Sequence, residues 1–163
     1  MINKTEFQKQ TFKTQGILNQ SMENGLNRVP NGWVPNNANS SELREKIRDI
    51  MYEKAERYRD TNKEKISDYN FIEISCRIPN DSIKKAINGK YKITRNFLAK
   101  FTVGLKLEIE EANTLFREFS GELNLTNDFD YIVYNALKTK DDIDFLINEV
   151  EEYTGINLDR DRT

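Results

Sequence analysis

Histidine is absent from this chain of 163 residues, and cysteine occurs once, at Cys76. The lack of histidine excludes acid–base catalysis by imidazole and zinc sites of the Cys/His type. A lone cysteine excludes an internal disulfide and suits a reducing cytoplasm. We therefore expect no metal, no cofactor and no catalytic residue, and we predict a binding protein and not an enzyme.

Long apolar runs are missing as well. No stretch approaches the roughly 20 apolar residues that a membrane span needs. Residues 1–13 are polar, whereas a signal peptide requires an apolar segment. Apolar residues make up 37% of the chain and charged residues 32%, which is typical of a small, highly solvated helical domain. We expect a soluble, cytoplasmic protein with no membrane partner.

The formal net charge of −2 hides an uneven distribution. Residues 77–106 carry eight basic side chains and one acidic side chain, whereas residues 107–163 carry five basic and fifteen acidic ones. The basic block predicts one positive face that meets a polyanion. The acidic third is then expected to face away from that polyanion. The alternative is a solvated surface whose charges balance across the fold.

Residues 1–40 form a polar arm rich in Asn and Gln, in which Trp33 lies between two prolines. Such a composition buries little apolar surface and favours turns. One interpretation is a disordered leader. The other is an arm that docks on its own domain or on a partner, with Phe7, Phe12 and Trp33 as the anchors.

From Ser41 onward, apolar residues recur at helical spacing and predict an all-α domain over residues 41–155, followed by a charged tail at 156–163. Helix N-caps are expected at Ser40 or Ser41, at Thr94, and at Asn127 or Asp128. Cys76 is expected to be buried. Phe71, Ile72 and Ile74 are candidate core residues of segment 68–76, for which a short helix is predicted and a strand is the alternative. The predicted helices span residues 41–60, 68–76, 80–88, 95–105, 109–119, 129–137 and 141–153.

The most specific pattern is a short helix, a turn, a second short helix, Asn88-Gly89 and an amphipathic helix. A helix-turn-helix motif has this order, and its second helix lies in the major groove of DNA. Short polar side chains and lysines on that helix suit base edges and phosphates, and the loop after it suits phosphates. The predicted DNA-binding residues are Arg77, Asn80, Asp81, Ser82, Lys84, Lys85, Lys90, Tyr91, Lys92 and Arg95.

The stretch IPNDSIKKAINGKYKITRNFLAKFTVGLKLEIEEANTLF resembles lambda-repressor-like (XRE-type) helix-turn-helix domains. Its continuation, FSGELNLTNDFDYIVYNALKTKDDIDFLINEVEEY, is similar to a C-terminal extension found in a subset of these domains in Firmicutes and their mobile elements. The resemblance covers residues 41–153 and implies a five-helix DNA-binding core with extra C-terminal helices. The chain departs from the family pattern at Arg77, where glycine is usual, and at Glu73, where a small apolar residue is usual.

These observations predict a sequence-specific DNA-binding transcriptional regulator of a phage or mobile element. The resemblance implies that it acts as a homodimer on palindromic double-stranded DNA. The alternative is an inhibitor or adaptor, encoded by a phage or mobile element, that binds a host defence protein through the polar arm and the acidic C-terminal surface. The sequence contains no arrangement of residues that favours an enzyme over either of these.

Overall fold

The computed structural model describes residues 40–159, and every regular element in that range is an α-helix. The prediction of an all-α fold is therefore confirmed for this part of the chain. The three predicted anchors of the polar arm, Phe7, Phe12 and Trp33, lie outside the described residues. The helices are α2 (Ser41–Asn62), α3 (Asp68–Cys76), α4 (Asn80–Ile87), α5 (Arg95–Gly104), α6 (Ile109–Phe119), α7 (Asp128–Thr139) and α8 (Ile143–Thr154).

Helix α2 is an amphipathic rod with a side-chain cap at its start. The hydroxyl of Ser40 accepts a hydrogen bond from the backbone N–H of Leu43 at 3.1 Å, as predicted. Four residues at a spacing of four, Leu43, Ile47, Met51 and Ala55, have no exposed surface. They form the single apolar stripe that attaches the helix to the core. The helix ends at Asn62, two residues later than expected, where Lys63 turns into the left-handed conformation.

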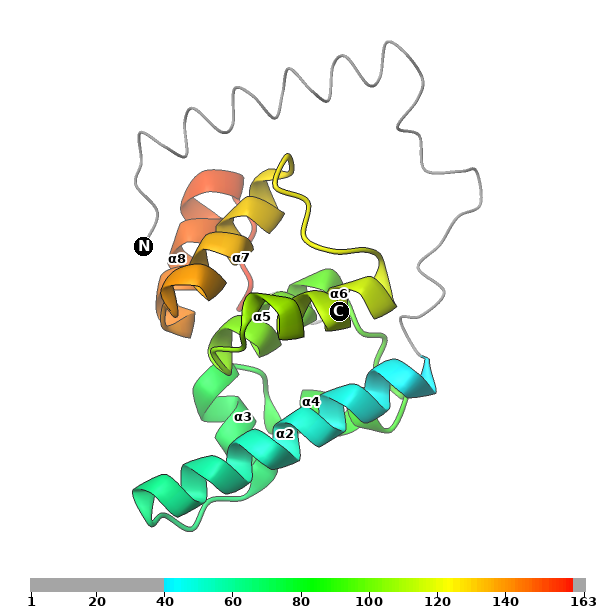
Figure 1. Cartoon of the computed structure of the whole chain (residues 1–163), viewed down its shortest axis with the longest axis vertical. Coiled ribbons are helices and arrows are strands. Elements are labelled where there is room, and N and C mark those ends of the chain that lie inside the picture. The colour runs from blue at the N-terminus through cyan, green and yellow to red at the C-terminus, as the bar shows by residue number, and fades with distance from the viewer. Residues whose placement is uncertain (1–39, 160–163) are drawn as a thin grey trace.

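Helix α5 lies at the centre of the arrangement. Helix α2 crosses α3, α4 and α6 on one side, while α7 and α8 pack side by side and contact α5 from the other (Figure 1). All seven residues from Phe97 to Val103 of α5 are buried. The short helix α3 contacts both α2 and α5, α4 contacts α2 and α3, and the C-terminal pair α7–α8 rests on α5.

Helices α3 and α5 approach each other closely at Gly104. A Cβ atom added there would lie 2.6 Å from the Cα and Sγ atoms of Cys76 and from the carbonyl oxygen of Ser75. Only glycine permits this contact between the two helices. Cys76 has no exposed surface, as predicted, and its thiol lies 3.6 Å from the carbonyl oxygen of Phe101. Burial raises the pKa of the Cys76 thiol, which keeps it protonated and unreactive.

The prediction that Ile74 belongs to the core is wrong, because 68% of its surface is exposed. Helix α3 buries Phe71, Ile72 and Cys76 instead. A helix turns by about 100° per residue, so Ile74 points nearly opposite to Ile72. The sequence alone did not show which side of this nine-residue helix faces α5. Among residues 40–159, no helix combines the length and apolar character needed to cross a membrane.

We predict that Gly104→Ala destabilises the domain by about 2 kcal/mol, because its new methyl group overpacks the contact between α3 and α5. Urea denaturation followed by circular dichroism measures this loss. Lys138→Ala, which places an alanine at an exposed position of α7, serves as the control and should change stability by less than about 0.5 kcal/mol. Equal stability of the Gly104→Ala variant and the control would contradict the close contact.

We also predict that Cys76 does not react with Ellman's reagent in the native protein at mildly alkaline pH and reacts fully in denaturant. Full burial blocks access, and the raised pKa keeps the thiolate population low. The thiol-reactive fraction should follow the unfolding curve measured by circular dichroism. Rapid labelling under native conditions would show that α3 and α5 do not enclose this thiol.

Candidate nucleic-acid interface

The connector between α3 and α4 has three residues, and Arg77 at its start is in the left-handed conformation with φ 54°. Its backbone N–H donates to the carbonyl oxygen of Glu73 at 3.0 Å and closes the end of α3. A side chain at this position costs about 1 kcal/mol relative to glycine. Arg77 therefore carries backbone strain that a glycine would not have.

The N-terminus of α4 is capped by a side chain of α3. Its N-cap residue, Pro79, offers no side-chain hydrogen bond, and the carboxylate of Glu73 accepts the backbone N–H of Asn80 at 2.9 Å instead. A negative charge at this end also suits the helix dipole. The side-chain amide of Asn80 donates to the side-chain oxygen of Asn70 at 2.7 Å. Both bonds fix the start of α4 on α3.

The outer side of α4 is polar and basic. Ile83 and Ala86 face the core with no exposed surface, whereas Asp81, Lys84 and Lys85 are exposed. Asn80 and Ser82 are half-buried at the same end of the helix.

The two lysines of this helix have different neighbours. The ammonium group of Lys84 lies 5.2 Å from the centre of the Tyr69 ring, a cation–π distance. Lys85 forms an exposed ion pair of 2.9 Å with Asp81. Asp81 therefore offsets part of the positive charge on this surface.

The loop after α4 alternates between exposed and packed side chains. Lys90 and Lys92 are exposed, and neither forms an ion pair with any residue between 40 and 159. Tyr91 packs its ring 5.8 Å from that of Phe97, and Ile93 is buried. The loop thus adds two lysines to the two on α4. We call Lys84, Lys85, Lys90 and Lys92 the lysine face.

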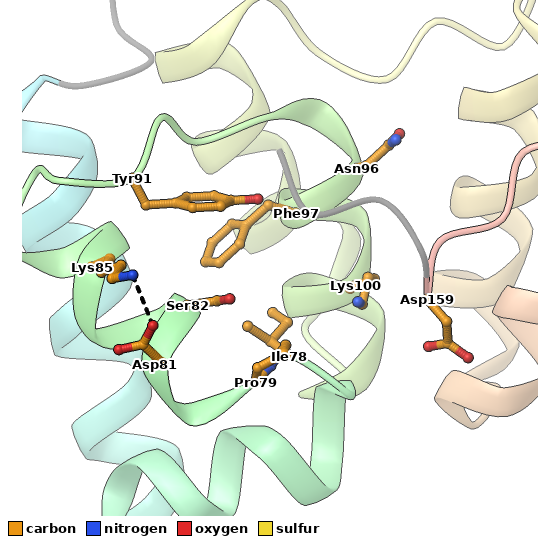
Figure 2. Close-up of a pocket in the computed structure, with 10 residues that line it drawn as sticks. All are labelled: Ile78, Pro79, Asp81, Ser82, Lys85, Tyr91, Asn96, Phe97, Lys100 and Asp159. Carbon is orange, nitrogen blue, oxygen red and sulfur yellow. Dashed lines mark ion pairs between the residues drawn. The ribbon is translucent and has the colours of Figure 1, made fainter.

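A cavity of about 520 Å³ borders this face. Figure 2 shows Asp81 and Lys85 of α4 on one side of the hollow and Asp159 on the other. The rings of Tyr91 and Phe97 form part of its wall. A polyanion that follows α4 would therefore meet two lysines of that helix and also carboxylates.

Arg95, one of the predicted DNA contacts, does not belong to this surface, because its guanidinium is bound within the fold. Its guanidinium donates from Nε at 3.0 Å and from Nη2 at 2.7 Å to the two carboxylate oxygens of Asp130. Nη1 donates to the hydroxyl of Ser120 at 2.7 Å and to the carbonyl oxygen of Gly121 at 3.0 Å. The last donor binds the carbonyl oxygen of Glu122 at 3.1 Å.

All five N–H donors of Arg95 are therefore occupied within the fold. Its guanidinium carbon also lies 4.9 Å from the centre of the Phe116 ring. Asp130, the main partner, is only 4% exposed and accepts the backbone N–H of Asn124 as well. The pair joins the start of α5 to the start of α7 and leaves no donor for a phosphate.

Three other cations of segment 77–106 also contact the C-terminal third. Arg77 is paired with Asp144 at 2.7 Å and with Asp159 at 3.0 Å. Lys106 is paired with Asp142 at 2.8 Å. The ammonium group of Lys100, a residue that is 6% exposed, donates to the carbonyl oxygen of Leu158 at 3.2 Å.

Segment 77–106 thus divides into two equal sets of cations. Arg77, Arg95, Lys100 and Lys106 contact the C-terminal third, and the lysine face points outward. The acidic third therefore lies against part of the basic block: three of these cations pair with its carboxylates, and Lys100 donates to a backbone carbonyl oxygen there. The expectation that the acidic third faces away from a polyanion stays a prediction. Within residues 40–159, no group of acidic residues or cysteine is arranged to hold a metal ion.

We predict that Arg95→Met lowers the free energy of unfolding by about 3 kcal/mol, because it leaves the carboxylate of Asp130 buried without its partner. Arg117→Met is the matched control. Arg117 is paired with Glu122, and 60% of its side chain is exposed, so its loss should cost less than about 1 kcal/mol. Urea denaturation of both variants gives the comparison, and equal midpoints would contradict a structural role for Arg95.

None of the protein-family models, curated proteins or solved structures compared with this chain matches it. The case for a nucleic-acid interface therefore depends on the geometry and charge of α3, α4 and the loop that follows.

Proposed function

We propose that the protein is a sequence-specific, double-stranded-DNA-binding transcriptional regulator. In this proposal α3 and α4 form a helix-turn-helix, α2–α6 form a lambda-repressor-like core, and α7–α8 are an extension of it. Helix α4 enters the major groove. The single observation that carries the proposal is the lysine face, which lies on one short helix and its loop while the other side of that helix is buried.

The polar side chains of α4 support this assignment. An α-helix with its side chains is about 10–12 Å in diameter, which fits a major groove about 12 Å wide. Asn80 and Ser82 near its start carry the amide and hydroxyl groups that recognise base edges. Lys84 and Lys85, one turn further, reach phosphates or guanine. The bonds from Asn70 and Glu73 hold the start of α4 in place and so orient these groups.

The positive charge of the loop after α4 also supports DNA binding. Lys90 and Lys92 follow the end of α4, where they can contact the phosphate backbone beside the groove. Phosphate contacts determine position and affinity, and base contacts determine sequence. We expect a homodimer that places two α4 helices on two half-sites, and analytical ultracentrifugation of the free protein tests this expectation.

We predict that Lys84→Ala/Lys85→Ala and Lys90→Ala/Lys92→Ala each weaken binding to a random-sequence duplex pool. Each variant removes two phosphate contacts, so the slope of log K against log salt should fall in magnitude by about 2. Fluorescence anisotropy over a salt series measures this slope. The control is Arg57→Ala/Lys138→Ala, which removes the same charge from exposed positions on α2 and α7 and should leave the slope unchanged.

Selection from the same pool separates base contacts from phosphate contacts. Asn80→Ala should relax the preference at one base position, whereas Lys90→Ala/Lys92→Ala should weaken all sequences alike. No binding by the wild-type protein at low salt, or equal losses in the lysine variants and the control, would overturn the proposed function.

A further inference from the structure

Arg77 lies at the turn before α4 and is held by two carboxylates from the C-terminal third. Asp144 comes from the first turn of α8, and Asp159 comes from the segment after that helix. About half of the Arg77 side chain is exposed, as are 68% of Asp144 and 34% of Asp159. Both carboxylates raise the pKa of the guanidinium, whose positive charge they stabilise.

Packing of the backbone, and not the ion pairs, sets the positions of these carboxylates. Leu158 has no exposed surface, and its carbonyl oxygen accepts the buried ammonium group of Lys100. Asp159 follows directly, and its N–H donates to the side-chain oxygen of Asn157 at 3.0 Å. Asp144 is adjacent to Ile143, which is buried against the core. The two acids therefore stay beside Arg77 even when the guanidinium leaves them.

Arg77 can leave these partners at little cost. Ion pairs at this exposure contribute about 0–1 kcal/mol, because water and salt screen them. A phosphate offers the guanidinium a charge-assisted, bidentate hydrogen bond. Asp159 also lines the hollow that contains Asp81 and Lys85 of α4 (Figure 2). A polyanion lying along α4 therefore approaches the same carboxylate that holds Arg77.

We propose that Arg77 contacts a DNA phosphate only after it leaves Asp144 and Asp159. These two carboxylates bind its guanidinium in the free protein, as a phosphate would in the complex, so DNA must displace them to form the contact. This inference depends on the proposed function of α4. The C-terminal segment then sets the affinity of the interface, because its carboxylates both repel the phosphate backbone and compete with it.

The test is the isosteric variant Asp144→Asn/Asp159→Asn, which keeps the shape of both side chains and removes their charge. It should bind a random-sequence duplex pool more tightly than the wild-type protein. The slope of log K against log salt should become steeper by about 0.9, because one phosphate contact is added. Thermal melting followed by circular dichroism verifies that the variant is folded.

The matched control is Glu151→Gln/Glu152→Gln, which makes the same change of charge at exposed positions of the same helix. These residues lie on the order of 10 Å further along α8 than Asp144, about one Debye length at 0.1 M salt. The control should leave the slope unchanged. Arg77→Gly added to Asp144→Asn/Asp159→Asn should remove the gain in slope, and glycine suits the left-handed backbone there.

The outcomes separate this inference from the proposed function. If the wild-type protein binds DNA and loses binding on substitution of the lysine face, but Asp144→Asn/Asp159→Asn behaves like its control, the inference about Arg77 is overturned and the function stands. If Asp144→Asn/Asp159→Asn binds more tightly and with a steeper slope than the wild-type protein, while its control matches the wild-type protein, both are supported. If no variant binds DNA at low salt, both are overturned.

Discussion

The ion pair between Arg95 and Asp130 is the interaction on which the arrangement of this molecule depends. A cation in the first turn of a helix opposes the helix dipole, so Arg95 would be poorly placed at the start of α5 without its partner. Asp130 supplies that partner from the first turn of α7, where an acid suits the dipole, and the loop before α7 supplies the carbonyl and hydroxyl acceptors. The Arg95 side chain thus connects α7 to α5, and its positive charge is not available on the surface.

The same principle explains why a strongly basic segment produces a moderately basic surface. Four of its eight cations contact the C-terminal third, and the four of the lysine face remain exposed. Exposed ion pairs such as those of Arg77 and Lys106 add little stability on their own, so the apolar contacts of α7 and α8 with α5 hold the two parts together. The ion pairs instead determine which charges remain available to a ligand.

Local signals were sufficient to predict the helices and insufficient to predict the roles of their charged residues. The caps at Ser40, Thr94 and Asn127 depend on neighbours three residues away, and the structure confirms all three. The lysines of α4 face outward because Ile83 and Ala86 fix the inner side of the helix. Arg95, in contrast, finds its partner 35 residues later, and no periodicity or motif encodes that distance. The burial of Lys100 depends on the same long-range packing, because Leu158 is 58 residues away.

Glu73 and Arg77, the two residues that differ from the pattern that the sequence resembles, both contact neighbouring elements. Glu73 caps α4, whose own N-cap is a proline without a side-chain acceptor. Arg77 has a strained backbone, and its side chain reaches the carboxylates of the C-terminal third. Both residues therefore connect the start of α4 to neighbouring elements, and the start of the helix determines its orientation. The backbone strain at Arg77, about 1 kcal/mol, is similar in size to what its exposed ion pairs contribute. Arg77 thus couples the C-terminal helices to the proposed DNA-binding helix.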